Sequence, residues 1–75
     1  MSKLPVISSK EMAKMLNKLG FYEVHQRGSH KKFKHDDGRV VIIPFHNDDL
    51  GRGIISKILK EIKISINEYL AFLKN

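Results

Sequence analysis

Hydrophobic residues in the first quarter of the chain recur at the spacing of one helical face. Their positions follow i, i+3, i+4 and i+7: Met12, Met15, Leu16 and Leu19. Ser8 and Glu11 precede them as a capping box, in which the serine caps the helix and the glutamate reaches back. Because Gly20 readily takes the left-handed conformation that ends a helix, the pattern predicts a helix over residues 9–19.

The next part of the chain changes from helical spacing to runs of aromatic and β-branched residues, which favour strands. Two such runs are present, at residues 21–25 and 40–43, and between them residues 30–35 are predicted as a further strand in which His30, Lys32 and Lys34 alternate with Lys31, Phe33 and His35. A break at Arg27-Gly28-Ser29 separates the first two predicted strands, and Asp-Asp-Gly-Arg at 36–39 is typical of a hairpin turn. The third predicted strand is continuously apolar up to Pro44, which indicates a strand at the centre or in the covered part of a sheet.

Two more helical patterns follow a loop at residues 45–51. The first has one apolar face: Ile54, Ile55, Ile58, Leu59 and Ile62. A second capping box, from Ser65 to Glu68, begins a last short helix. That helix carries four large apolar residues: Tyr69, Leu70, Phe72 and Leu73. The order α-β-β-β-α with an extra C-terminal helix predicts an α+β fold of two layers, in which helices cover one face of a three-stranded antiparallel sheet.

The length and composition narrow the range of functions. A chain of 75 residues forms a single domain, residues 1–75, with a core too small for a large enclosed cofactor cavity. The absence of cysteine excludes disulfides, thiolate metal sites and cysteine nucleophiles. Since no apolar run approaches the roughly 18 residues of a membrane span, we expect a cytoplasmic protein with no membrane partner and no small-molecule cofactor.

The charge favours an acidic or polyanionic partner. The formal net charge is +6 and the sequence pI is about 9.8. Nucleic acid and acidic proteins are the partners that such a charge attracts, ahead of an anionic membrane surface.

A histidine in a cationic segment is the strongest candidate for chemistry. Residues 27–34 contain no acid and four cations: Arg27, Lys31, Lys32 and Lys34. His30 follows Gly28-Ser29, which allow a tight turn and a close approach of the backbone to a ligand. If Phe33 faces the core, strand alternation places His30, Lys32 and Lys34 together on the uncovered face of the sheet.

This arrangement suits general acid–base cleavage of a phosphodiester. Histidine is the side chain best able to transfer a proton near neutral pH, and neighbouring cations stabilise the charge that develops on phosphorus. In RNA the 2′-hydroxyl would attack phosphorus, giving a 2′,3′-cyclic phosphate and a free 5′-hydroxyl. The alternative is that His30 is an ordinary surface histidine on a solvated basic strand.

The remaining histidines and acids give weaker signals. The spacings of His25, His35 and His46 around His30 match no familiar metal-ligand motif, and i, i+5 on one strand places side chains on opposite faces. His46 is interpreted as a loop residue, and the alternative is that it approaches a bound phosphate from the loop after the third strand. Asp48-Asp49 fits better as favourable charge before a helix N-terminus than as a catalytic pair.

Taken in order, several short segments carry a family resemblance: Ser8-Ser9-Lys10-Glu11; Leu19-Gly20-Phe21; Gln26-Arg27-Gly28-Ser29-His30 with Phe33; Val41 to Pro44 before His46; Leu50-Gly51-Arg52-Gly53; Ile58-Leu59-Lys60; and Ser65 to Leu70. Together they resemble the HicA-type mRNA interferase toxins, also called YcfA-like proteins. The resemblance spans nearly the whole chain, and its most specific part is the Gly-Ser-His element.

The resemblance implies a fold like that of double-stranded-RNA-binding domains and a metal-independent endoribonuclease that cleaves mRNA and arrests translation. It implies that His30 is catalytic and that the partner is a HicB-type antitoxin. We expect Arg27, Lys32 and Lys34 to bind phosphate, with Gly28 and Ser29 shaping the turn. The partner of His30 in proton transfer stays open between Lys32, Lys34 and a water molecule.

Two other classes of function stay open. A non-catalytic RNA-binding module would read the shape of RNA through basic residues on the second helix, for which Arg52, Lys57 and Lys60 are the candidates. A protein-interaction module would use the basic face only to dock an acidic partner, and its affinity for RNA would be negligible at physiological salt.

Overall fold

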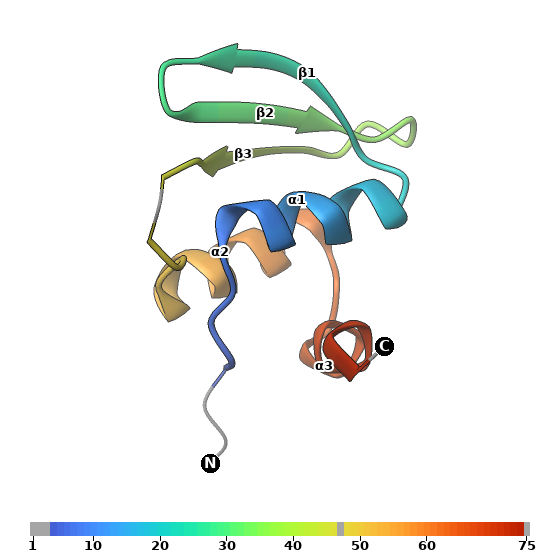
Figure 1. The fold of residues 1–75 in the computed structure, drawn as a ribbon. Helices are drawn as coiled ribbons and strands as arrows, with labels where there is room; N and C mark the ends of the chain where they lie inside the picture. Colours follow the sequence, from blue (N-terminus) through green and yellow to red (C-terminus); the bar gives the residue numbers. More distant parts are fainter. Residues whose placement is uncertain (1–3, 47, 75) are drawn as a thin grey trace.

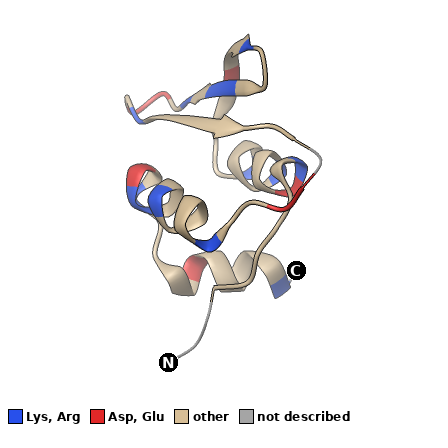
Figure 2. Cartoon of the chain, turned by 90° about the vertical axis from the view of Figure 1, so that its left-hand side faces the viewer, with Lys and Arg blue, Asp and Glu red and all other residues tan. Residues whose placement is uncertain are grey.

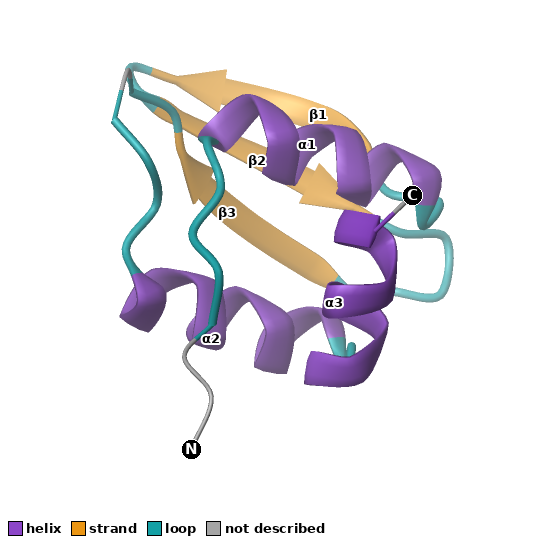
Figure 3. Cartoon of the chain, turned by 60° about the horizontal axis from the view of Figure 1, so that its bottom comes forward, coloured by secondary structure: helices purple, strands orange, loops and turns teal. Residues whose placement is uncertain are grey.

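A computed structural model describes residues 4–46 and 48–74, and these contain the predicted order of elements (Figure 1). The elements are α1 (Ser9–Lys18), β1 (Tyr22–Arg27), β2 (His30–Lys34), β3 (Val40–Pro44), α2 (Arg52–Ile62) and α3 (Ile66–Lys74). The strands form one antiparallel sheet in the order β1-β2-β3. Helices α1 and α2 lie on one face of the sheet, and α3 packs beside them away from the strands (Figure 3). The predicted two-layer α+β fold is therefore confirmed.

The helices of this small domain are fixed by local capping and by one core. In α1 the Ser8 hydroxyl accepts from the Glu11 N–H at 3.1 Å, and the Glu11 carboxylate accepts from the Ser8 N–H at 3.0 Å. Ser65 and Glu68 make the same pair of bonds before α3, so both predicted capping boxes are present. No helix in residues 4–46 and 48–74 is long and apolar enough to cross a membrane.

The core lies between the sheet and the helices. Its buried apolar side chains come from every element except β1: Met12, Met15, Leu16, Phe33, Val41, Ile43, Ile55, Ile58, Leu59, Ile62 and Tyr69, with Ile7, Phe21 and Leu50 from the connecting segments. The hydroxyl of Tyr69 donates to the carbonyl of Pro5 at 2.6 Å, which gives this buried group a partner and holds the N-terminal segment against α3.

Two details of the predicted apolar faces are wrong. Of the two positions expected for β3, the centre of the sheet is wrong because β3 lies at an edge; one of its faces is covered, so Val41 and Ile43 are buried while Ile42 is 54% exposed. Ile54 is also 40% exposed, whereas Ile55 in the same turn of α2 is fully buried. A run of consecutive apolar residues does not indicate which face of a strand is covered.

The strand boundaries also differ from the predicted ones. β1 begins after Phe21, which is buried, and it continues to Arg27 because Arg27 pairs with His30 across the turn. β2 ends one residue earlier than expected, at Lys34, and β3 includes Pro44, which pairs with His30.

Strand β1 contains a β-bulge that the sequence pattern does not indicate. Glu23 pairs with Phe33 and His25 pairs with Lys32, so Val24 is an extra residue without a partner in β2. As a result Tyr22 and His25 face the same side of the sheet, although strict alternation along the strand would place them on opposite sides.

His35 has a structural role at the base of the β2–β3 hairpin. Its Nδ1 accepts from the Asp37 N–H at 3.1 Å, so its Nε2 carries the proton and donates to the Leu19 carbonyl at 3.1 Å. The ring also lies edge-on to Phe21. A Cβ at Gly20, where φ is +96°, would lie 2.8 Å from Nε2, so this site needs glycine for space and for conformation.

Asp37 in the same hairpin makes folding sensitive to acid. Its carboxylate accepts from the Arg39 N–H at 3.0 Å and from the Arg39 guanidinium at 2.8 Å, and these bonds hold its pKa below the usual value. Because the folded-state pKa is lowered, this stabilisation is present above the unfolded pKa of about 3.9 and is lost as pH falls through the folded value. Asp37→Asn should therefore reduce the loss of stability between pH 5 and pH 2, measured as urea midpoints. If the urea midpoint of Asp37→Asn fell as steeply between pH 5 and pH 2 as that of the wild type, this role of Asp37 would be contradicted.

Candidate catalytic face of the sheet

The face of the sheet that α1 and α2 leave uncovered is organised in three rows by the strand register. The rows, each read from β1 through β2 to β3, are Arg27–His30–Pro44, His25–Lys32–Ile42 and Tyr22–Lys34–Val40. The alternate residue Phe33 is buried against the helices, whereas His30, Lys32 and Lys34 are exposed. The predicted common face of His30, Lys32 and Lys34 is thus confirmed. We call it the uncovered face; Figure 2 shows the basic residues along the chain.

A two-residue turn fixes the position of His30. Gly28 has φ +59°, while Ser29 is not among the residues with positive φ, which is the pattern of a type II′ turn with glycine at its first central position. The Ser29 carbonyl accepts from the Phe45 N–H, and the Gly28 carbonyl accepts from the Gln26 side chain at 3.3 Å. The turn is therefore bonded to both neighbouring segments, and it places Arg27 directly opposite His30.

An open hollow of about 630 Å³ lies over the first two rows of the uncovered face. Seven residues line it: His25, Arg27, Gly28, Ser29, His30, Lys32 and Ile42. We call it the outer hollow. It contains two cations and no acidic side chain, so it suits an anionic group such as a phosphodiester.

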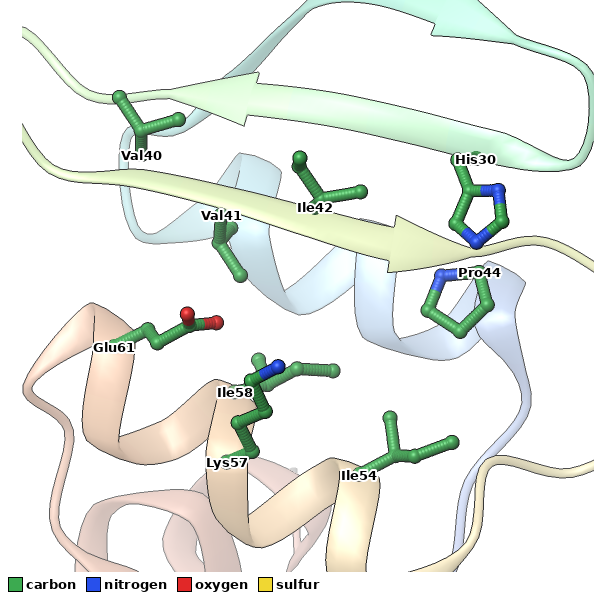
Figure 4. Close-up of a pocket in the computed structure, with 9 residues that line it drawn as sticks. All are labelled: His30, Val40, Val41, Ile42, Pro44, Ile54, Lys57, Ile58 and Glu61. Atoms are coloured by element: carbon green, nitrogen blue, oxygen red, sulfur yellow. The ribbon is translucent and has the colours of Figure 1, made fainter.

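A second hollow begins at His30 and runs along the free edge of β3 above α2 (Figure 4). It has a volume of about 450 Å³, and we call it the edge groove. Ile54 and Ile58 of α2 face Val41 and Pro44 across it, with Lys57 and Glu61 on the helix side. Because His30 lines both hollows, a chain that passes over the sheet can contact the imidazole from either side.

Two of the nearby lysines are placed differently from Lys32. Lys31 faces the helix side, where its ammonium lies 4.2 Å from the centre of the Phe45 ring and 3.4 Å from the Glu23 carboxylate. Lys34 is on the uncovered face but in the third row, and it does not line the outer hollow. Of the expected site residues, the structure brings together Arg27, Gly28, Ser29, His30 and Lys32.

His25 is a residue of this face that the sequence pattern missed. Counting i, i+5 along one strand placed His25 and His30 on opposite faces, which is wrong. The turn at Gly28-Ser29 separates them onto neighbouring antiparallel strands, and both line the outer hollow. The signal was available, because a two-residue hairpin fixes the facing of every residue that follows it.

The other candidates lie outside the outer hollow. His46 is exposed in the loop after β3 and lines neither hollow. Asp49 forms an isolated bridge with Ser8, and the Arg52 side chain donates to the Leu4 carbonyl at 2.8 Å, which ties α2 to the N-terminal segment. In the described part of the chain no three histidine, aspartate or glutamate residues come together as a metal site.

Comparison with known families decides the kind of protein. A family model described as the HicA toxin of bacterial toxin–antitoxin matches residues 9–64 of the 75 in the chain. The chain belongs to the HicA toxin family. The match runs from α1 past the end of α2 and includes all of the outer hollow and the edge groove. A HicA toxin is one half of a toxin–antitoxin pair, so its partner is an antitoxin. A search of curated proteins finds no match to this HicA chain.

Proposed function

We propose that this HicA toxin is a metal-independent endoribonuclease that cleaves mRNA and thereby inhibits translation, with His30 as a proton-transfer group. The observation that carries the proposal is the position of His30. It is exposed on the uncovered face, between the edge groove and a hollow that contains Arg27 and Lys32 and no acidic side chain.

The chemistry follows from these neighbours. A phosphodiester of RNA in the outer hollow would lie within reach of Arg27 and Lys32, whose positive charges stabilise the additional negative charge of a five-coordinate phosphorus. His30 either accepts the proton of the attacking 2′-hydroxyl or donates a proton to the departing 5′-oxygen. The 2′-oxygen forms a bond to phosphorus, the bond from phosphorus to the 5′-oxygen breaks, and the products are a 2′,3′-cyclic phosphate and a 5′-hydroxyl.

The same face suits an inhibitory partner. It is basic and open, so an acidic surface of the antitoxin can cover His30 and exclude RNA. A HicB-type antitoxin is the partner that the family implies.

The test is cleavage of a long single-stranded RNA by the purified protein in the presence of EDTA. We expect fragments with 2′,3′-cyclic phosphate ends and with 5′-hydroxyl ends, which a polynucleotide kinase labels without prior phosphatase treatment. Intact RNA would overturn the proposal, and so would cleavage that appears only when a divalent cation is added.

A further inference from the structure

Four side chains of the outer hollow form a square on two neighbouring strands. Arg27 is paired with His30 in one row, and His25 is paired with Lys32 in the next row on the same face. The two cations therefore occupy one diagonal, and the two imidazoles occupy the other. We propose that His25 is the second proton-transfer group of the cleavage reaction, acting on the opposite side of the phosphodiester from His30. This inference rests on the proposed ribonuclease function.

The diagonal has a suitable length. Diagonal neighbours on one face of an antiparallel pair are about 7–8 Å apart at Cα, still within reach of long and aromatic side chains. A phosphate at the centre of the square is then within reach of both cations, and it has one imidazole on each side. In-line displacement at phosphorus suits this arrangement, because the attacking oxygen approaches the phosphorus from one side and the departing oxygen leaves from the opposite side.

The other side chains of the outer hollow are poorly suited to the second proton transfer. Lysine and arginine side chains ordinarily keep their protons at neutral pH, whereas histidine is the side chain best able to transfer one there. Arg27 and Lys32 therefore serve as fixed charges. Ile42 has no proton to transfer, the hydroxyl of Ser29 is a much weaker acid and base than an imidazole, and the outer hollow contains no carboxylate. His25 is the one imidazole that lines this hollow besides His30, and imidazole is the side chain suited to proton transfer.

The reaction then balances with two imidazoles in opposite protonation states. One imidazole is neutral and takes the proton of the 2′-hydroxyl as the 2′-oxygen attacks. The other is protonated and gives its proton to the 5′-oxygen as the bond from phosphorus breaks. The enzyme finishes with the two states exchanged, and exchange of protons with water restores them.

The first experiment compares His25→Gln with the wild type on a chimeric oligonucleotide that contains one ribonucleotide. Glutamine keeps a hydrogen-bonding side chain on this exposed position but cannot transfer a proton. We expect cleavage at pH 7 to slow by about 10²-fold, with one limb lost from a bell-shaped pH profile. Urea midpoints should match those of the wild type, which excludes a folding defect.

The second experiment separates the two roles by changing the leaving group. In a substrate whose 5′-bridging oxygen is replaced by sulfur, the departing thiolate needs no proton, because thiols are far more acidic than alcohols. The variant that lacks the general acid should cleave this substrate at close to the wild-type rate. The variant that lacks the general base should stay slow. We expect the sulfur substrate to restore cleavage in only one of the two variants, His25→Gln or His30→Ala.

The outcomes separate this inference from the proposed function. If the wild type does not cleave RNA, the proposed function fails. If His30→Ala abolishes cleavage while His25→Gln keeps the wild-type rate and pH profile, the role of His25 alone is overturned. The role of His25 is also overturned if the sulfur substrate restores cleavage in both variants or in neither. His46→Ala is the matched control, because His46 is exposed but lines neither hollow; loss of the pH limb in that variant would assign the second transfer to His46 instead.

Discussion

Alanine at His30 is expected to slow RNA cleavage by a factor of about 10² to 10⁴, the usual contribution of a positioned acid–base group. The fold should be unaffected, since His30 is exposed and makes no side-chain hydrogen bond or ion pair among the described residues. Expression of the wild type from a tightly controlled promoter should therefore arrest growth and fragment mRNA. Expression of His30→Ala should do neither. The measurements are cleavage rates in vitro and mRNA integrity in growing cells.

Variants on α2 test the alternative of a binding module. Lys57 and Lys60 are exposed on α2, away from the outer hollow, and they are the cations with which a shape-reading module would hold RNA. In a ribonuclease, alanine at these positions should weaken the affinity for RNA modestly and leave the cleavage of bound RNA unchanged. Growth arrest that survives His30→Ala but disappears in Lys57→Ala or Lys60→Ala would assign the function to binding.

Alanine at Phe33 is expected to destabilise the protein by about 3–5 kcal/mol, as for other buried phenylalanines. Phe33 is 2% exposed, lies in the central strand and packs in the core between the sheet and the helices. Because a domain of this size lies at the low end of the roughly 5–15 kcal/mol typical of folded proteins, this loss should remove most of the stability. The free energy of unfolding in urea measures the effect.

The neighbour Lys34 provides a matched control on the same strand. Its side chain lies on the uncovered face and is exposed, so Lys34→Ala should change stability by less than about 0.5 kcal/mol. Growth arrest should then be lost in Phe33→Ala through unfolding, with His30 still present. A Phe33→Ala variant as stable as Lys34→Ala would contradict the position of Phe33 in the core.

The fold was largely predictable because local signals and the hydrophobic pattern agree. The capping boxes at Ser8 and Ser65 mark helix beginnings with pairs of residues three apart, and both form as predicted. The face of β2 was also predictable, since Phe33 is the one large apolar residue of that strand. The position of β3 at the sheet edge was not, because its four consecutive apolar residues carry no alternation that could report a covered side.

The candidate site was predictable as far as it depends on one segment. Arg27 to Lys32 are close in the sequence, and the turn keeps them close in space. His25 was missed because its relation to His30 is a cross-strand diagonal. That relation follows from the pairing of β1 with β2 across the Gly28-Ser29 turn, and counting residues along a single strand gives the wrong face.

The bulge at Val24 also identifies a position at which strand β1 can lose one residue without changing the outer hollow. His25 lies on the uncovered face because of its distance along β1 from the Gly28-Ser29 turn. Glu23 lies on the opposite face because it pairs with Phe33 on the other side of the bulge. Deletion of Val24 would leave the pairs Glu23–Phe33 and His25–Lys32 intact. Deletion of one residue between His25 and His30 would instead turn one of these two histidines toward the helices. A one-residue deletion at the bulge is therefore compatible with the arrangement of the outer hollow, whereas a one-residue deletion between His25 and His30 is not.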